Sequence, residues 1–233
     1  MLVDSHRLVI DGWIAFAREH GREMSTDEVV ARTFGRRTLD ILVDVFGLSL
    51  AEAAEAVAAG VDDKSAEIGR AGGLPPVPGA PEFVHAALQA GIPSAVVSSA
   101  ARGNIQLALA GIGLAGAFDV VVDHDRVTRG KPAPDPYLLA AVELGVPIGD
   151  CVVFEDTPPG LASGRAAGAR CVGVASLGRP ELLAGADLVI DDFRGLRPDD
   201  VLSRLDGPSR RAVPRGARCR GRSTAGGADA RQR

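Results

Sequence analysis

Apolar residues recur along the chain with two different periods, and the change falls near residue 73. Before it they follow the pattern of an amphipathic helix, as in Leu8, Trp13, Ile14 and Ala17, which fall near positions i, i+5, i+6 and i+9. The pattern predicts only helices in this part, over 5–20, 26–33, 36–46 and 49–70.

The segment GGLPPVPGAP then breaks the helical pattern with four prolines and three glycines, which is typical of a linker. Short apolar runs alternate with helical patterns after it, and this order predicts a parallel sheet covered by helices on both faces. Strands are predicted at SAVVS, FDVVVD, CVVFE, CVGVA and DLVID, and helices over 81–90, 102–110, 135–145, 159–167 and 179–184.

An all-helical segment in front of an α/β core indicates a cap domain. We therefore predict a helical cap over 1–74, an α/β core over 75–206 and a disordered tail over 207–233. The tail is rich in Gly, Arg, Ala and Ser and has almost no large apolar residue, so it cannot bury enough surface to offset its ordering entropy.

Charge is divided unevenly between these parts. The tail holds eight arginines and one aspartate, which is +7, and since the whole chain carries −4, residues 1–206 carry −11. An arginine-rich tail can touch nucleic acid, but this one has no aromatic residue for base stacking. A solvated extension is the favoured interpretation, and no nucleic-acid partner is expected.

No apolar run reaches the roughly 20 residues of a membrane span, and the first residues do not resemble a signal peptide. We therefore expect a cytoplasmic protein without a membrane partner. Cys151, Cys171 and Cys219 have neither paired nor metal-ligand spacing, which predicts reduced thiols.

Polar residues follow several of the predicted strands, at the sheet edge where α/β proteins bind ligands. They are Ser98, Ser99, Asp123, Asp125, Lys131, Glu155 and Asp156. A hydroxyl can hold phosphate oxygens, a lysine can neutralise their charge, and an acidic pair can bind Mg²⁺. Each residue alone has an ordinary structural interpretation, but together they predict a magnesium-dependent phosphate site.

Three longer motifs carry a family resemblance: AVVSSAARGN, RGKPAPDPYLLAAVELG and CVVFEDTPPGLASGRAAGARCVGV. They resemble motifs of the haloacid dehalogenase-like (HAD) phosphohydrolases with a helical cap, especially sugar-phosphate phosphatases and β-phosphoglucomutases. The resemblance implies a Rossmann-like parallel sheet. It also implies that Ser98 and Lys131 are catalytic groups for the phosphoryl transfer, and that Asp156 and Glu155 hold Mg²⁺.

The same resemblance implies a DxDG motif at the end of a first strand, just ahead of LVDS, with the nucleophile and the general acid/base as its two aspartates. LVDS stands here at 2–5. We therefore expect that the motif and its central strand belong to an upstream segment lost through a wrongly assigned start, and that the chain is inactive without them. Asp4, with Ser5, is interpreted as a helix cap rather than as a substitute nucleophile.

Substrate contacts are predicted in the cap. TFGRRTLDIL resembles the substrate-facing segment of sugar phosphatases, which makes Arg36 and Arg37 candidates, and a solvated position at a helix start is the open alternative for both. Trp13 and Ser99 are further candidates, and Trp13 is equally compatible with packing inside the cap.

Val9 and Thr38 stand where β-phosphoglucomutases carry a histidine and an arginine, and this favours hydrolysis over a mutase reaction. The prediction is thus a Mg²⁺-dependent phosphatase for a small phosphorylated metabolite, as a monomer or homodimer. A phosphomutase and a non-catalytic remnant or binding protein stay open as alternatives.

Overall fold

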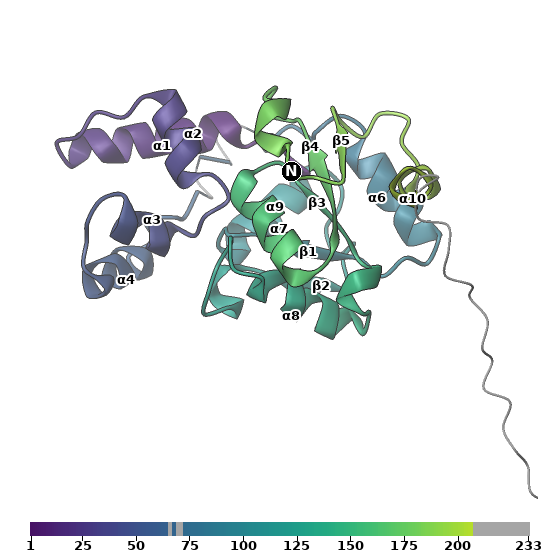
Figure 1. Cartoon of the computed structure of the whole chain (residues 1–233). Helices are drawn as coiled ribbons and strands as arrows, with labels where there is room; N and C mark the ends of the chain where they lie inside the picture. The colour runs from purple at the N-terminus through teal and green to yellow at the C-terminus, as the bar shows by residue number, and fades with distance from the viewer. Residues whose placement is uncertain (65–66, 69–71, 207–233) are drawn as a thin grey trace, which may run out of the picture.

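The computed structural model describes residues 1–64, 67–68 and 72–206. They form a helical lobe and an α/β lobe, which lie side by side in Figure 1. The tail predicted to be disordered, with Cys219, lies outside the described residues.

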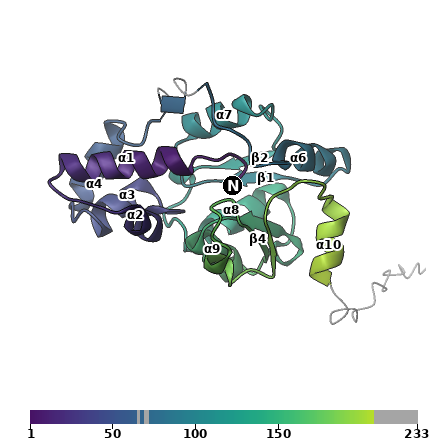
Figure 2. The ribbon, with the colours of Figure 1, turned by 90° about the horizontal axis from the view of Figure 1, so that it is seen from above.

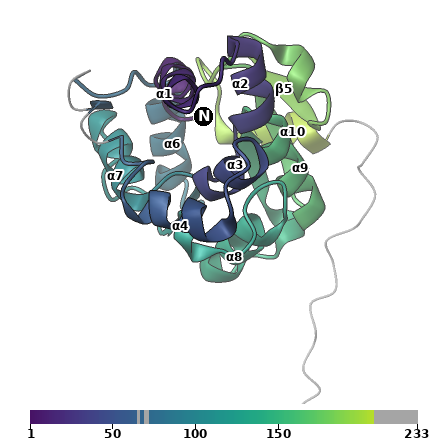
Figure 3. The same cartoon turned by 90° about the vertical axis from the view of Figure 1, so that its left-hand side faces the viewer.

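The helical lobe contains α1 (His6–Glu19), α2 (Thr26–Thr33), α3 (Thr38–Asp44) and α4 (Leu50–Ala58). Figure 3 views these helices from their outer side. The apolar faces of α1, α2 and α3 share one cluster that includes the fully buried Ala17 and Val29. The apolar periodicity thus gives this lobe a small core of its own.

The single helix predicted over 49–70 is wrong, because α4 ends at Ala58 and a turn follows. Gly60 has a φ of 84°, a backbone conformation that glycine adopts readily, and its N–H donates to the carbonyl of Val57. The helix over 36–46 is shorter than predicted, since Arg37 is extended and α3 begins at Thr38.

All five predicted strands are present. They are β1 (Ala95–Val97), β2 (Val120–Val122), β3 (Val152–Glu155), β4 (Arg170–Val174) and β5 (Leu188–Ile190). They pair in parallel, but as two separate sheets: β1 with β2, and β3 with β4 and β5. The parallel sheet is thus confirmed, with an interruption between β1 and β3.

Helices cover both faces of these sheets (Figure 2). The helices are α6 (Ala80–Gln89), α7 (Arg102–Gly111), α8 (Asp135–Leu144), α9 (Pro158–Ala167) and α10 (Pro198–Asp206), and the short 3₁₀ turns are His124–Arg126, Ile148–Asp150 and Pro180–Leu183. The α8 and α9 helices pack on one face, while α6, α7 and α10 pack on the other. The α10 helix was not predicted from the sequence, and the helix expected over 179–184 is a 3₁₀ turn.

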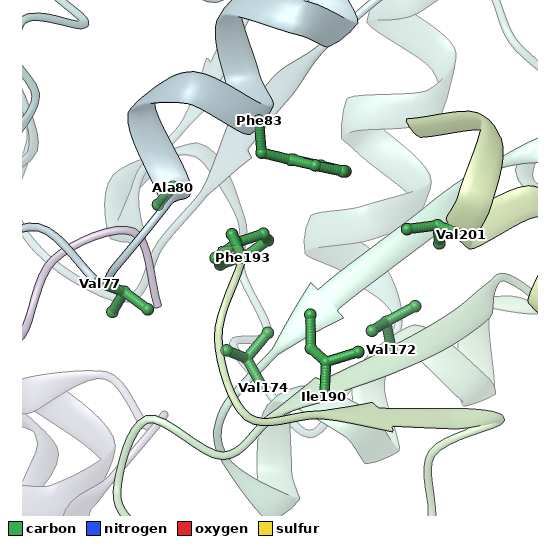
Figure 4. Close-up of a cluster of buried hydrophobic side chains, with 8 residues drawn as sticks. All are labelled: Val77, Ala80, Phe83, Val172, Val174, Ile190, Phe193 and Val201. Atoms are coloured by element: carbon green, nitrogen blue, oxygen red, sulfur yellow. The ribbon is translucent and has the colours of Figure 1, made fainter. Parts of the chain in front are cut away.

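Figure 4 shows the main apolar cluster of the second face. Phe83 of α6 and Val201 of α10 cover Val172 and Val174 of β4. Cys171 of β4 instead joins the cluster under α9. Because both faces of β4 are buried, its sequence is a continuous apolar run rather than an alternating one.

The two connections between the lobes lie against each other. Val3 forms an antiparallel bridge with Pro76, the N–H of Asp4 donates to the carbonyl of Pro75, and the N–H of Val77 donates to the carbonyl of Leu2. The chain therefore leaves the α/β lobe and returns to it at one point.

Candidate active site

Lys131 is the centre of a buried polar cluster at the carboxyl ends of β1 and β3. Its ammonium forms an ion pair with Glu155, donates to the carbonyl oxygen of Val97 at 3.1 Å, and lies 5.2 Å from the centroid of the Tyr137 ring. The Tyr137 hydroxyl donates to the same carboxylate at 2.5 Å. Burial, together with the charge of Glu155, raises the pKa of Tyr137 well above its usual range.

Asp156 is also buried, but it has different partners from Glu155. Its Oδ2 lies 3.2 Å from the N-terminal ammonium of Met1 and 3.3 Å from His6 Nε2, and accepts a 3.0 Å hydrogen bond from the Ser176 hydroxyl. Burial by itself would raise the pKa of Asp156, but the ammonium and His6 outweigh it and hold this pKa far below its usual range. Asp156 is therefore an anion in the folded protein.

The two serines after β1 have different partners. Ser98 lines the cavity described below, and its hydroxyl accepts the N–H of Ala100 at 3.2 Å. The Ser99 hydroxyl donates to the carbonyl of Gly35 in the cap at 3.0 Å. Ser99 thus joins cap to core. Asp123 is held by Arg102 Nε at 2.6 Å and lies outside the cavity lining.

The three cap candidates also differ. Arg36 lines the cavity and pairs with Asp44, whereas Arg37 is held by Asp40 through two 2.8 Å bonds and donates to the core carbonyl of Val127 at 3.0 Å. Arg37 therefore joins the cap to the core in this arrangement.

Trp13 lines the cavity while it stacks on Phe46 with a centroid distance of 5.7 Å. It can pack inside the cap and border the cavity at once, so the two interpretations from sequence are compatible. Val9 and Thr38 also line the cavity and place no cation there. Asp4 accepts the N–H of His6 at 3.1 Å, as expected of a cap, but Ser5 makes no side-chain capping bond.

A cavity of about 750 Å³ connects these residues. It begins under the cap, passes Ser98, Lys131 and Asp156, and continues between β1 and β3 as far as Ile92 and Cys151. We call its deeper part, bordered by β1, β3, α6, α7 and α8, the slot. The upper part has the polar groups that a phosphorylated ligand requires.

Asp156 and Glu155 differ in how well their carboxylates could act as ligands of Mg²⁺. Asp156 is an anion at the cavity, and Mg²⁺ commonly binds to one or two carboxylates, waters and substrate phosphate. Both oxygens of Glu155 already accept hydrogen bonds, one from Lys131 and Tyr137 and the other from the N–H of Asp156. Within the described residues there is no group of three or more metal-ligating side chains. Asp156 therefore fits the metal, and the role of Glu155 stays a prediction.

Three contributors to the site have no motif that identifies them: the Met1 ammonium, His6 and Ser176, which contact Asp156. Tyr137, which completes the surroundings of Glu155, lies within the motif RGKPAPDPYLLAAVELG. A signal for Ser176 exists, since it follows the end of β4 at the same sheet edge. Pro159 lies in the first turn of α9, where proline is tolerated, and Thr157 caps that helix through the N–H of Gly160.

Known proteins resemble the chain over most of its length. Residues 2–168 match the haloacid dehalogenase-like hydrolase family. A validoxylamine A 7'-phosphate phosphatase from Streptomyces hygroscopicus subsp. limoneus is 32% identical, over 84% of this chain and 91% of that protein. Hexitol phosphatase A from Escherichia coli is 37% identical, over 81% of this chain and 85% of the relative.

Solved structures have the same fold. A HAD hydrolase of family IA, variant 3, from Entamoeba histolytica has a TM-score of 0.73 and 27% identity, and covers 88% of this chain and 95% of its own. A β-phosphoglucomutase from Clostridium difficile has a TM-score of 0.72 and 21% identity, and covers 88% of this chain and 93% of its own. It supports the fold alone. None of the helices in the described part of the chain has the length and apolar character of a membrane span.

Proposed function

Because this chain belongs to the haloacid dehalogenase-like hydrolases, we propose that its site hydrolyses phosphate monoesters of small metabolites, namely sugar or polyol phosphates. The main support is the buried ammonium of Lys131, paired with Glu155 at the carboxyl ends of β1 and β3, in a cavity that Asp156 and the cap also line. The names of the two similar phosphatases agree with this substrate class.

The groups at this edge suit a transferring phosphoryl group. Lys131 has three N–H donors, and two of them have acceptors, Val97 and Glu155, among the described residues. The third can bind a phosphate oxygen, and Ser98 lies at the same cavity. Fixed donors in a buried site stabilise the charge of the transition state without reorganisation.

Mg²⁺ is the proposed cofactor, with Asp156 as its protein ligand. When bound, the ion would neutralise phosphate charge. The Ser176 hydroxyl orients the Asp156 carboxylate through a hydrogen bond, and Glu155 holds the Lys131 ammonium in place through an ion pair.

The proposed nucleophile is a carboxylate carried by a segment that occupies the slot. Among the described residues, Glu155 is already paired with Lys131 and Tyr137, and Asp156 with the Met1 ammonium and His6. The carboxylate oxygen would attack phosphorus, the ester P–O bond would break, and the metabolite would leave as an alcohol with a proton donated by a second acidic residue of the same segment. Water would then cleave the acyl phosphate and release inorganic phosphate. Without such a segment the chain is expected to be inactive.

The cavity residues Val9 and Thr38 favour hydrolysis over a mutase reaction, because a mutase must hold a second phosphate as its substrate turns. Arg36 and Trp13 are the proposed substrate contacts of the cap. The cap, core and tail boundaries, the cytoplasmic location and the monomeric or homodimeric state stay predictions.

The test compares the chain with a variant in which an apolar strand ending in Asp-x-Asp-Gly precedes Met1. Phosphate release is measured on a panel that includes hexitol phosphates and glucose 6-phosphate, with Mg²⁺ or with EDTA. We expect Mg²⁺-dependent release by the extended variant alone. Release that does not need the metal, or no release from any substrate, would overturn the proposal.

A further inference from the structure

We propose that the loop after β4, residues 176–179, anchors the cap to the core and fixes its position relative to Asp156. Leu177 is the central positioning residue of this loop, because it lies in the apolar cluster of the cap. The anchor itself does not depend on the proposed function. Only the assignment of Asp156 as a metal ligand rests on it.

Leu177 is the one core residue, among those that the structure describes, in the apolar cluster shared by α1, α2 and α3. The other members of this cluster lie between residues 9 and 46, and they include Trp13. Leu177 is half-buried, and it packs against this cluster although it belongs to a loop of the other lobe. If the cap moved away, both Leu177 and the cluster would be exposed to water, which opposes the separation.

Arg179 gives the loop a second contact with the cap. Its Nη1 lies 3.1 Å from Oδ1 of Asp27 in the first turn of α2, while its Nε lies 3.2 Å from Oε1 of Glu181 in the core. The Asp27 side chain is 86% exposed, and exposed ion pairs contribute little to stability. Leu177 should therefore supply most of the attachment, and Arg179 should mainly orient the cap.

The other end of the loop is fixed to the core. The N–H of Ala175 donates to a carbonyl of β5 at 2.8 Å, and the Ser176 hydroxyl donates to Asp156 Oδ2 at 3.0 Å. Gly178 has a φ of 65°, and its N–H closes the turn by donating to the carbonyl of Ala175 at 2.8 Å. Because the turn is closed in this way, a shift of Ser176 would also move Leu177.

The loop connects the two sides of the cavity. Trp13 lines the cavity from the cap and shares a cluster with Leu177, whereas Asp156 lines it from the core and is bound by Ser176. Two neighbouring residues of one loop thus contact both sides. Their positions set the distance between the proposed substrate contact and the proposed metal ligand, and with it the size of ligand that fits under the cap.

An alternative interpretation is that Leu177 only fills space in the cap. The connections between the lobes, which pair residues 2–4 with 75–77, already hold the cap to the core at a different place. Under this alternative, trimming Leu177 would loosen the cap, but the bond between Ser176 and Asp156 would have no effect on it. The two interpretations therefore differ in what a change at Ser176 does to the cap.

The first experiment uses the full chain, with its sole tryptophan, Trp13, as the probe. Leu177→Ala should raise the acrylamide quenching of Trp13 fluorescence about twofold or more, because the cluster opens. Leu177→Met is similar in volume and should keep the wild-type value. Leu182→Ala is the matched control, since Leu182 is half-buried but lies outside the cap cluster. Equal quenching in Leu177→Ala and Leu182→Ala would overturn the anchor.

Amide hydrogen exchange tests the link to Asp156. Ser176→Ala removes the hydroxyl that binds this carboxylate and should speed exchange in α2 several-fold, whereas Ser176→Thr keeps a hydroxyl and should stay near the wild type. Exchange in α6 of the core should not change in either variant. Unchanged exchange of α2 in Ser176→Ala, or a rise in α6 as large as in α2, would overturn the link. Because neither experiment measures phosphate release, a failure of the anchor is distinguishable from a failure of the proposed activity.

Discussion

The carbonyl oxygen of Gly35 accepts a 3.0 Å hydrogen bond from the Ser99 hydroxyl, 64 residues later in the chain. On its other side, the space where a Cβ of Gly35 would stand lies 2.4 Å from Thr157 Oγ1. Gly35 also has a φ of 75°. The cap therefore contacts the core at a position where only glycine fits.

Gly35→Ala should separate cap from core. The left-handed backbone costs about 1 kcal/mol for alanine, and the contact with Thr157 adds to it. Gly21→Ala is the matched control, since Gly21 has a φ of 68° with nothing within 4 Å. We expect trypsin to cleave after Arg37 several times faster in Gly35→Ala than in the control. Equal cleavage rates would contradict a tight cap contact.

Gly160→Ala should disturb the Lys131 cluster. A Cβ at Gly160 would lie 2.1 Å from the carboxyl carbon of Glu155, so the helix and the carboxylate must move apart. Such overpacking lowers the unfolding free energy by about 1–3 kcal/mol. A Cβ at Gly103, in the first turn of α7, would have no atom within 4 Å, so Gly103→Ala should raise the unfolding free energy by about 0.5–1 kcal/mol. Urea denaturation should therefore show a lower unfolding free energy than wild type for Gly160→Ala and a higher one for Gly103→Ala.

Lys131→Met should weaken the fold as well as the chemistry. It leaves Glu155 as a buried carboxylate without its cation, and the loss of one partner of a buried pair costs about 3–5 kcal/mol. The double variant Lys131→Met, Glu155→Gln removes both charges and should recover part of this loss in urea denaturation. If the single variant is as stable as the double one, the ion pair does not stabilise the fold as described.

Alkaline pH should weaken the fold through Cys171. Burial, followed by the nearby charge of Asp187, raises the pKa of this thiol from 9.0 to about 11. A pKa that is higher in the folded state gives stability that is complete below about pH 9 and is lost as the pH rises towards 11. Urea denaturation at pH 8, 9 and 10 should show the decline in the wild type. The decline should be smaller in Cys171→Ala, and equal declines would contradict the assignment.

The strands were predictable because each is a short apolar run. The clearest case is β4, which is buried on both faces because these faces belong to two different clusters. The helix boundary after Ala58 was harder to predict, because Gly60 within an alanine-rich pattern does not by itself end a helix. The rule that ligands bind at strand ends correctly brought Lys131, Glu155 and Ser98 to one edge.

What the sequence could not predict is the direction of each side chain at that edge. Glu155 and Asp156 are neighbours, yet one pairs with Lys131 and the other with Met1 and His6. These contacts join residues about 150 positions apart and depend on how the cap connection packs against the core. Local pattern holds no information about such long-range partners.

The bridge between Val3 and Pro76 makes the cap an exchangeable module. Because the chain leaves and re-enters the core at adjoining residues, everything between them can be lengthened, shortened or replaced by a different lobe without moving a core strand. Lys131 and Asp156 stay on the core side of this junction, while Arg36 and Trp13 lie beyond it. The residues that recognise a ligand can therefore change, by evolution or by design, independently of the residues that act on it.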